Sequence, residues 1–139
     1  MKCDEFKESF KEKYGFDWNP YSFNWSDYTL LEEFVREFNE YFDCWWDPEL
    51  YNYDYSEFLV IYCSNHFDKW WDPIKVNWYY SSLYLAMYCS RYFKKWWSPK
   101  RFYVDQVAVK ALFEHCSDYK HLWYEVVCAW QTRSSQKLR

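Results

Sequence analysis

Three cysteines stand at nearly equal intervals, and thiolates at regular spacing could hold a metal ion or form disulfides. Cys63, Cys89 and Cys116 are separated by 26 and 27 residues, and Cys63-x-x-His66 is the nearest approach to a metal-ligand pair. Structural zinc sites need two such pairs. Phe38 occupies the preceding position of the same series. A position that accepts Phe or Cys is an apolar core position, where a free thiol packs as a small hydrophobic group. We therefore expect buried thiols, no metal and no cofactor.

A nucleophile of the Cys–His type is the second chemical option. His115, Cys116 and His121 lie close in sequence. Such a site also needs an orienting third group and an oxyanion hole, and the sequence offers neither. Paired carboxylates can perform general acid–base catalysis, but several on one helix are more typical of a solvated face. The acidic residues concerned are Glu32, Glu33, Glu37 and Glu40. The single glycine also excludes Gly-rich phosphate loops and nucleophile elbows. We expect no enzyme and no catalytic residue.

Basic residues interleaved with aromatic residues form a third candidate site, in the second half of the chain. Phosphate contacts and base stacking by such groups hold single-stranded nucleic acid. Nucleic-acid-binding domains are usually basic, whereas this chain has a net charge of −4. The cluster comprises Arg91, Lys94, Lys95, Lys100 and Arg101, around Trp96, Trp97, Phe102 and Tyr103.

The elements that position these residues are related to one another. The sequence FDCWWDP at residues 42–48 returns as FDKWWDP at 67–73 and FKKWWSP at 93–99, at intervals of 25 and 26 residues. A fixed period of this size indicates a repeat array. The third copy has two apolar rows at helical spacing, as expected for a helix held between two neighbours. These rows contain residues 85, 86, 89, 92, 93, 96 and 97.

Prolines and capping residues mark the ends of the predicted helices. Pro48, Pro73 and Pro99 follow the tryptophan pairs and prevent the helix from continuing. Alternating aromatic residues at 51, 53 and 55 favour an extended linker. Gly15 is expected to disturb the first helix near its end. Candidate N-caps of the later helices are Asn24, Asp27, Asn52, Ser56, Asn77 and Ser82.

The predicted fold is all-α, an array of about five single-helix repeats of roughly 26 residues with extended linkers. It forms one domain over residues 1–130, and the direction of successive helices, parallel or antiparallel, is open. The first and last copies are atypical because terminal repeats face water on one side. The repeats span about 1–20, 21–48, 49–73, 74–99 and 100–126. Residues 131–139 are polar and basic, and we expect a frayed tail.

The N-terminus indicates the compartment. Residues 1–8 are charged and contain no apolar signal-peptide core. The longest apolar run, residues 58–63, is too short to cross a bilayer. We therefore expect a cytoplasmic protein with all six cysteines reduced and with no membrane contact.

Charge and aromatic content point to binding. Residues 1–60 carry a net charge of −10 and residues 61–139 a net charge of +6, which could steer a partner or drive self-association, or could simply reflect solvated faces. Trp and Tyr dominate interface hot spots. We expect a non-enzymatic protein-binding module, such as a small inhibitor or sequestering protein. Nucleic-acid binding by the basic half is the alternative. The expected partner-binding residues are Tyr84, Met87, Arg91, Lys94, Lys95, Lys100 and Arg101.

Overall fold

The computed structural model describes residues 1–137, which form helices joined by turns and contain no strand. The prediction of an all-α fold is confirmed. The longer helices are α1 (Lys2–Tyr14), α2 (Tyr28–Phe38), α4 (Glu57–Tyr62), α6 (Trp78–Tyr88), α8 (Gln106–His115) and α9 (Lys120–Lys137). The short helices are α3 (Phe42–Trp45), α5 (Phe67–Trp70) and α7 (Phe93–Trp96).

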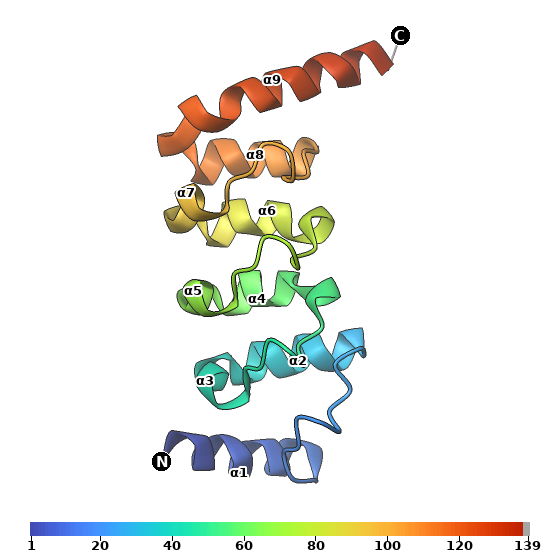
Figure 1. Cartoon of the computed structure of the whole chain (residues 1–139), viewed down its shortest axis with the longest axis vertical. Coiled ribbons are helices and arrows are strands. Elements are labelled where there is room, and N and C mark those ends of the chain that lie inside the picture. The colour runs from blue at the N-terminus through green and yellow to red at the C-terminus, as the bar shows by residue number, and fades with distance from the viewer. Residues whose placement is uncertain (138–139) are drawn as a thin grey trace.

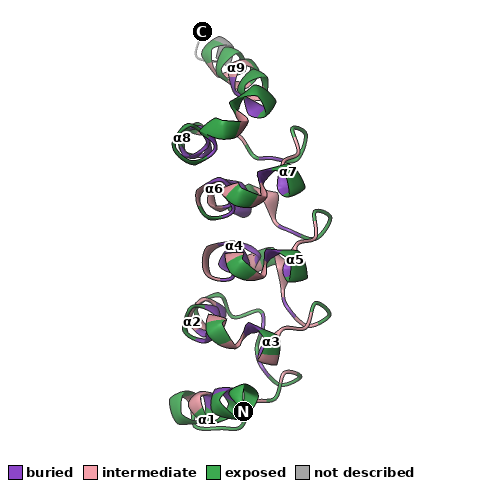
Figure 2. Cartoon of the chain, turned by 90° about the vertical axis from the view of Figure 1, so that its left-hand side faces the viewer, coloured by how far each residue is buried: buried purple, intermediate pink, exposed green. Residues whose placement is uncertain are grey.

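Helices that are neighbours in sequence are also neighbours in space. α2 packs on α4, α4 on α6, and α6 on α8. Each linker crosses back before the next long helix begins, so that these four helices run in the same direction (Figure 1). Figure 2 shows them in one layer, with α3, α5 and α7 in a second layer beside it. The orientation that the sequence left open is therefore parallel for these four helices.

The predicted single helices are each broken in two, so that part of the prediction is wrong. After α6, Cys89 leaves helical geometry with φ −120° and ψ 25°, and a 3₁₀ turn then leads into α7. The indole Nε1–H of Trp96 donates to the Cys89 carbonyl at 2.7 Å, which stabilises the break. The apolar residues keep a nearly helical spacing across the 3₁₀ turn, so the sequence pattern did not reveal the break. Equivalent bonds join Trp45 to Phe38, Trp70 to Cys63 and Trp123 to Cys116.

Aromatic rings connect each short helix to the segment that follows it. The Phe42 ring lies nearly parallel to Trp46, with centroids 5.1 Å apart, and to His66, with centroids 4.5 Å apart. His66 is thus a packed ring, as its position in the sequence pattern indicated. The same arrangement places Phe67 against Trp71 and Tyr92, and Phe93 against Trp97 and Tyr119.

The linkers differ from the prediction in one respect. Residues 53–55 form a 3₁₀ turn rather than an extended segment, because the Asn52 side chain accepts the Asp54 N–H and closes the chain. Asp27 and Asn77 cap α2 and α6 as predicted. Ser56 instead accepts the N–H of Asn77 at 2.8 Å, and so ties a later linker to α4.

The two ends of the chain have distinct structures. Gly15 ends α1 in the left-handed region, with φ 81°, and its N–H donates to the Lys11 carbonyl at 2.8 Å. At the other end α9 continues to Lys137, so the predicted frayed tail is wrong for residues 131–137. This stretch lacks Gly and Pro, and nothing in it breaks a helix. The rest of that prediction, residues 138–139, lies outside the described residues.

Candidate functional site

The three regularly spaced thiols are core residues, as predicted. Cys63 and Cys89 are fully buried and Cys116 is 1% exposed. Burial raises the pKa of Cys89 and of Cys116 to about 12, and it raises the pKa of Cys63 as well. A thiol with a raised pKa is a poor nucleophile and a poor metal ligand at neutral pH. Within residues 1–137, no group of three or more His, Cys, Asp or Glu side chains could hold a metal ion.

The candidate Cys–His pair is not assembled. The Cys116 thiol points to the Ala86 carbonyl, 3.6 Å away, inside the core. His115 lies at the surface, with its Nε2 atom 3.9 Å from the Glu114 carboxylate. His121 is an exposed residue of α9. These side chains therefore do not form a nucleophile and base.

Three of the four candidate carboxylates are engaged in structural contacts, and the fourth, Glu40, lies beyond α2 in the 3₁₀ turn that follows it. Glu33 and Glu37 of α2 both pair with Lys13 of α1, at 3.6 and 2.7 Å. Glu32 accepts a hydrogen bond of 2.6 Å from the Tyr62 hydroxyl of α4. These contacts join neighbouring helices, which accounts for the acidic face of α2.

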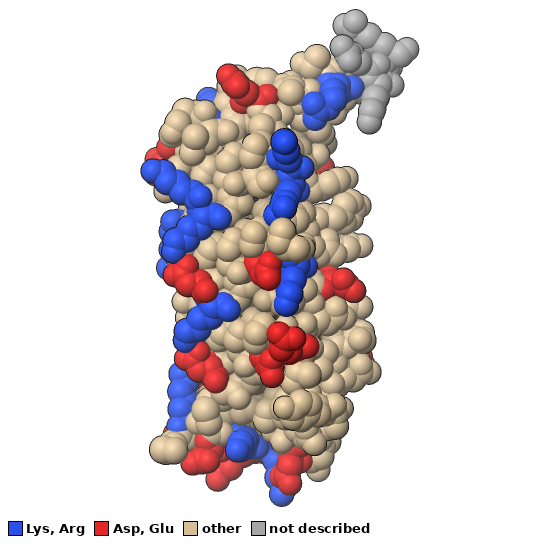
Figure 3. All heavy atoms as spheres, in the orientation of Figure 1, with Lys and Arg blue, Asp and Glu red and all other residues tan. Residues whose placement is uncertain are grey.

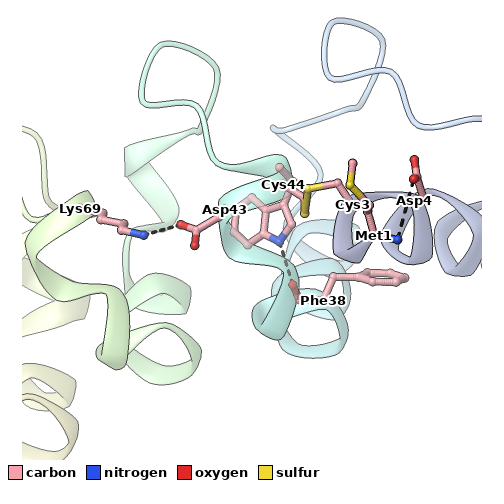
Figure 4. The surroundings of a disulfide bond; sticks show 8 residues. Met1, Cys3, Asp4, Phe38, Asp43, Cys44 and Lys69 are labelled. Carbon is pink, nitrogen blue, oxygen red and sulfur yellow. Dashed lines mark hydrogen bonds and ion pairs between the residues drawn. A yellow bond between two sulfur atoms is a disulfide. The ribbon is translucent and has the colours of Figure 1, made fainter.

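A disulfide between Cys3 and Cys44 corrects the prediction that all six cysteines are reduced. It joins α1 to α3, with Cα atoms 5.4 Å apart (Figure 4). Comparison of the repeats could not detect this pair because Cys3 precedes the aligned positions. Disulfides are rare in the reducing cytoplasm, so this bond does not support the predicted cytoplasmic location. In the described part of the chain, no helix is long and apolar enough to cross a membrane.

Ion pairs join successive short helices at the position where Cys44 carries the disulfide. Lys69 of α5 pairs with Asp43 of α3 at 2.5 Å, and Lys95 of α7 pairs with Asp68 of α5 at 2.7 Å. The Lys69 hydrogen bond holds the pKa of Asp43 below its usual value. Cys44, Lys69 and Lys95 each precede the first tryptophan of a pair. Each short helix is thus linked to an earlier segment through the same position, and Figure 3 shows charges of alternating sign along this edge.

We call the two ion pairs Asp43–Lys69 and Asp68–Lys95 the ladder, and it ends at α7. Lys94 occupies the position of Asp43 and Asp68, and the next lysine position is taken by Leu122. The Arg91 guanidinium lies 4.8 Å from the centroid of the Tyr92 ring rather than on a carboxylate. None of the ion pairs within residues 1–137 includes Arg91, Lys94, Lys100 or Arg101. We call these four residues the basic end of the ladder.

The seven predicted partner-binding residues fall on two surfaces. Arg91, Lys94 and Lys95 lie on α7 and the turn before it, and residues 100–101 follow in the linker. Tyr84 and Met87 belong to α6, in the other layer (Figure 2). Two aromatic residues of the same cluster, Trp96 and Phe102, are 1% and 4% exposed and are closed to a ligand.

One buried acid was not anticipated from the sequence. Glu57, at the start of α4, is 6% exposed, and its Oε2 atom has no hydrogen-bond partner among the described residues. Burial raises the pKa of this carboxyl group. The sequence contains no distinct signal for it, because the equivalent positions of α2 and α8 also carry charged residues, Glu32 and Lys110. No protein-family model, curated protein or solved structure matches this chain.

Proposed function

We propose that the chain is a helical repeat array that acts by binding a protein partner rather than by catalysis. The indole–carbonyl bonds recur at the same positions within successive segments, and the ring stacks and ion pairs recur between one segment and the next, which supports the repeat interpretation. Stacked repeats build extended surfaces suited to protein recognition. Inhibition or sequestration of the partner is the form of activity that a small binding module would have.

The observation that carries this proposal is the basic end of the ladder. In the other steps of the ladder a lysine pairs with an aspartate of the preceding short helix, whereas Lys94 occupies an aspartate position and takes part in none of the ion pairs of residues 1–137. Arg91, Lys100 and Arg101 add further cations to the same segment. An acidic protein segment could complete the ladder by supplying the missing carboxylates.

Comparative affinity capture tests this function. Wild-type protein and a Lys94→Glu variant would be used as bait, and the captured proteins identified by mass spectrometry at low and at high salt. We expect acidic partners that are lost in the variant and weakened by salt, because exposed charge pairs are screened. Lys7→Glu, the same charge change on the exposed face of α1, is the matched control. Identical partner lists for wild type and Lys94→Glu would refute this assignment.

Nucleic-acid binding is the second candidate, and the unpaired cations favour it as well. Stacking of bases would have to use Tyr103, which is 40% exposed, or the partly exposed Trp97, because Trp96 and Phe102 are buried. A gel-shift assay with single-stranded oligonucleotides at low salt separates the two functions. Absence of a shift removes the nucleic-acid candidate.

A further inference from the structure

The linkers that precede α2, α4, α6 and α8 begin with the same turn. Each turn starts at the residue before a proline, and the carbonyl of that residue accepts the N–H groups three and four residues later. In the first three turns its side chain also accepts the N–H two residues later, at 2.9 to 3.0 Å. Such a bond closes the turn and satisfies a backbone donor. The four residues at this position are Asn19, Asp47, Asp72 and Ser98.

The fourth turn lacks the side-chain acceptor. Its backbone bonds are kept, because the Ser98 carbonyl accepts the N–H groups of Arg101 and Phe102 at 3.2 and 2.9 Å. The Lys100 N–H is the donor that corresponds to those bonded by side chains in the other turns. Among the described residues, no hydrogen bond joins this N–H to the shorter Ser98 side chain. An acceptor oxygen is therefore missing at a position where two earlier repeats carry a carboxylate.

The surroundings of Ser98 are exposed and basic. Ser98 is partly exposed, and the three residues after it, Pro99, Lys100 and Arg101, are exposed. The Nη1 atom of Arg101 donates to the Pro73 carbonyl of the preceding turn at 3.1 Å. Serine followed by proline and basic residues is the kind of sequence that proline-directed serine kinases modify. Ser98 is the only serine or threonine of the chain that precedes a proline.

We propose that Ser98 is a phosphorylation site and that its phosphate controls the basic end of the ladder. A serine kinase transfers the γ-phosphoryl group of ATP to the Ser98 Oγ atom. The bond from Oγ to phosphorus forms, the bond from the γ-phosphorus to the bridging oxygen breaks, ADP leaves and the hydroxyl proton is released. A phosphoserine has three strong acceptor oxygens, which lie one bond farther from the backbone than those of aspartate. They can therefore accept the Lys100 N–H, while the Lys100 ammonium group supplies an opposite charge.

The phosphate changes the charge of the surface on which the proposed function depends. It adds about −1.5 to −2 charges at neutral pH. Lys94, four residues before Ser98, and Lys100 and Arg101 after it are three of the four cations of the basic end. Phosphorylation thus alters the charge about as much as Lys94→Glu does, and it should repel an acidic partner. This regulatory role rests on the proposed function, whereas the modification itself does not.

Treatment of the disulfide-bonded full chain with a proline-directed serine kinase and magnesium ATP tests the site. Mass spectrometry should find one phosphate per chain, on Ser98, and none on Ser98→Ala or Pro99→Ala. In two-dimensional nuclear magnetic resonance spectra, the amide proton of Lys100 should move to lower field on phosphorylation, as a new charge-assisted hydrogen bond requires. Ser98→Asp should move it in the same direction without kinase, and circular dichroism verifies the fold of each variant.

Two results would overturn the site. Absence of phosphate on Ser98 of the folded wild type would show that the kinase does not recognise this turn. Phosphorylation that leaves the Lys100 amide unmoved would show that the phosphate does not replace the missing acceptor.

Affinity capture with phosphorylated protein and with Ser98→Asp tests the regulation. We expect the acidic partners to fall to the level captured by Lys94→Glu. Ser22→Asp, the same change at an exposed position of the first linker, is the matched control and should capture as wild type does. Equal capture by phosphorylated and unmodified protein would refute the regulatory role. If unmodified protein captures no acidic partner, the proposed function fails, and the phosphate on Ser98 and the Lys100 amide shift still decide the modification site.

Discussion

Breaking the Cys3–Cys44 disulfide is expected to lower the free energy of unfolding by about 4 kcal/mol. The bond closes a loop between residues 41 positions apart. In the chain-entropy treatment, a cross-link of this span restricts the unfolded chain by that amount. The native fold should survive, because Phe6 and Phe10 of α1 are fully buried and their rings pack on Phe34 of α2.

Urea unfolding provides the measurement, followed by tryptophan fluorescence and by far-ultraviolet circular dichroism. Cys3→Ser and Cys44→Ser should shift the midpoint to lower urea by equal amounts, and reductant should shift wild type to the same position. Cys128→Ser removes a partly exposed free thiol and serves as the control. Thiol titration of the unfolded, unreduced protein should find the four free cysteines. Equal midpoints for wild type and Cys3→Ser without reductant, or six reactive thiols, would refute the reasoning.

Three further changes test other features of the fold. Trp96→Phe removes the indole N–H that donates to the Cys89 carbonyl, and urea unfolding should report a loss of about 1 to 3 kcal/mol; no loss would show that the bond does not hold the break. Ser56→Ala removes the buried acceptor of the Asn77 N–H and should cost a similar amount, whereas Ser22→Ala, at an exposed site, should cost little. Burial lowers the pKa of His66, so the proton binds the unfolded chain more tightly. Stability is then full above about pH 6.5 and falls as the pH is lowered toward the folded pKa. His66→Tyr should flatten this dependence in thermal melts, and an unchanged pH profile would contradict the assignment.

Helix content and buried positions could be predicted from the sequence because both follow from local periodicity. Leu59, Leu85 and Leu112 occupy one predicted position and are all fully buried. The caps at Asp27 and Asn77 followed from the same local chemistry. The break at Cys89 could not be predicted, because it depends on a side chain seven residues later that takes over a backbone carbonyl.

Long-range pairings were beyond the sequence pattern for a related reason. The position that carries Lys69 and Lys95 also carries Cys44, and aligned positions indicate equivalence, not which residue lies across from which. The disulfide needs α1 to lie beside α3, and this placement follows from tertiary packing, such as that of Phe6 and Phe10 on Phe34, which the repeat pattern does not contain. The predicted binding residues were grouped on one helix, but the basic ones lie in one layer and Tyr84 and Met87 of α6 in the other, because the chain breaks before α7.

The ring stacks have a consequence for how the protein unfolds. Because Phe67 is covered in part by Tyr92 from the next segment, losing that segment would bare a large apolar ring on the one that remains. Melting of one segment should then weaken its neighbour, so that disorder spreads through the stack instead of stopping at a boundary. Tyr119, which stacks on Phe93, is the last ring of this series, so the segment that contains it is not covered by a later ring. Exchange of amide hydrogens is expected to begin in that segment.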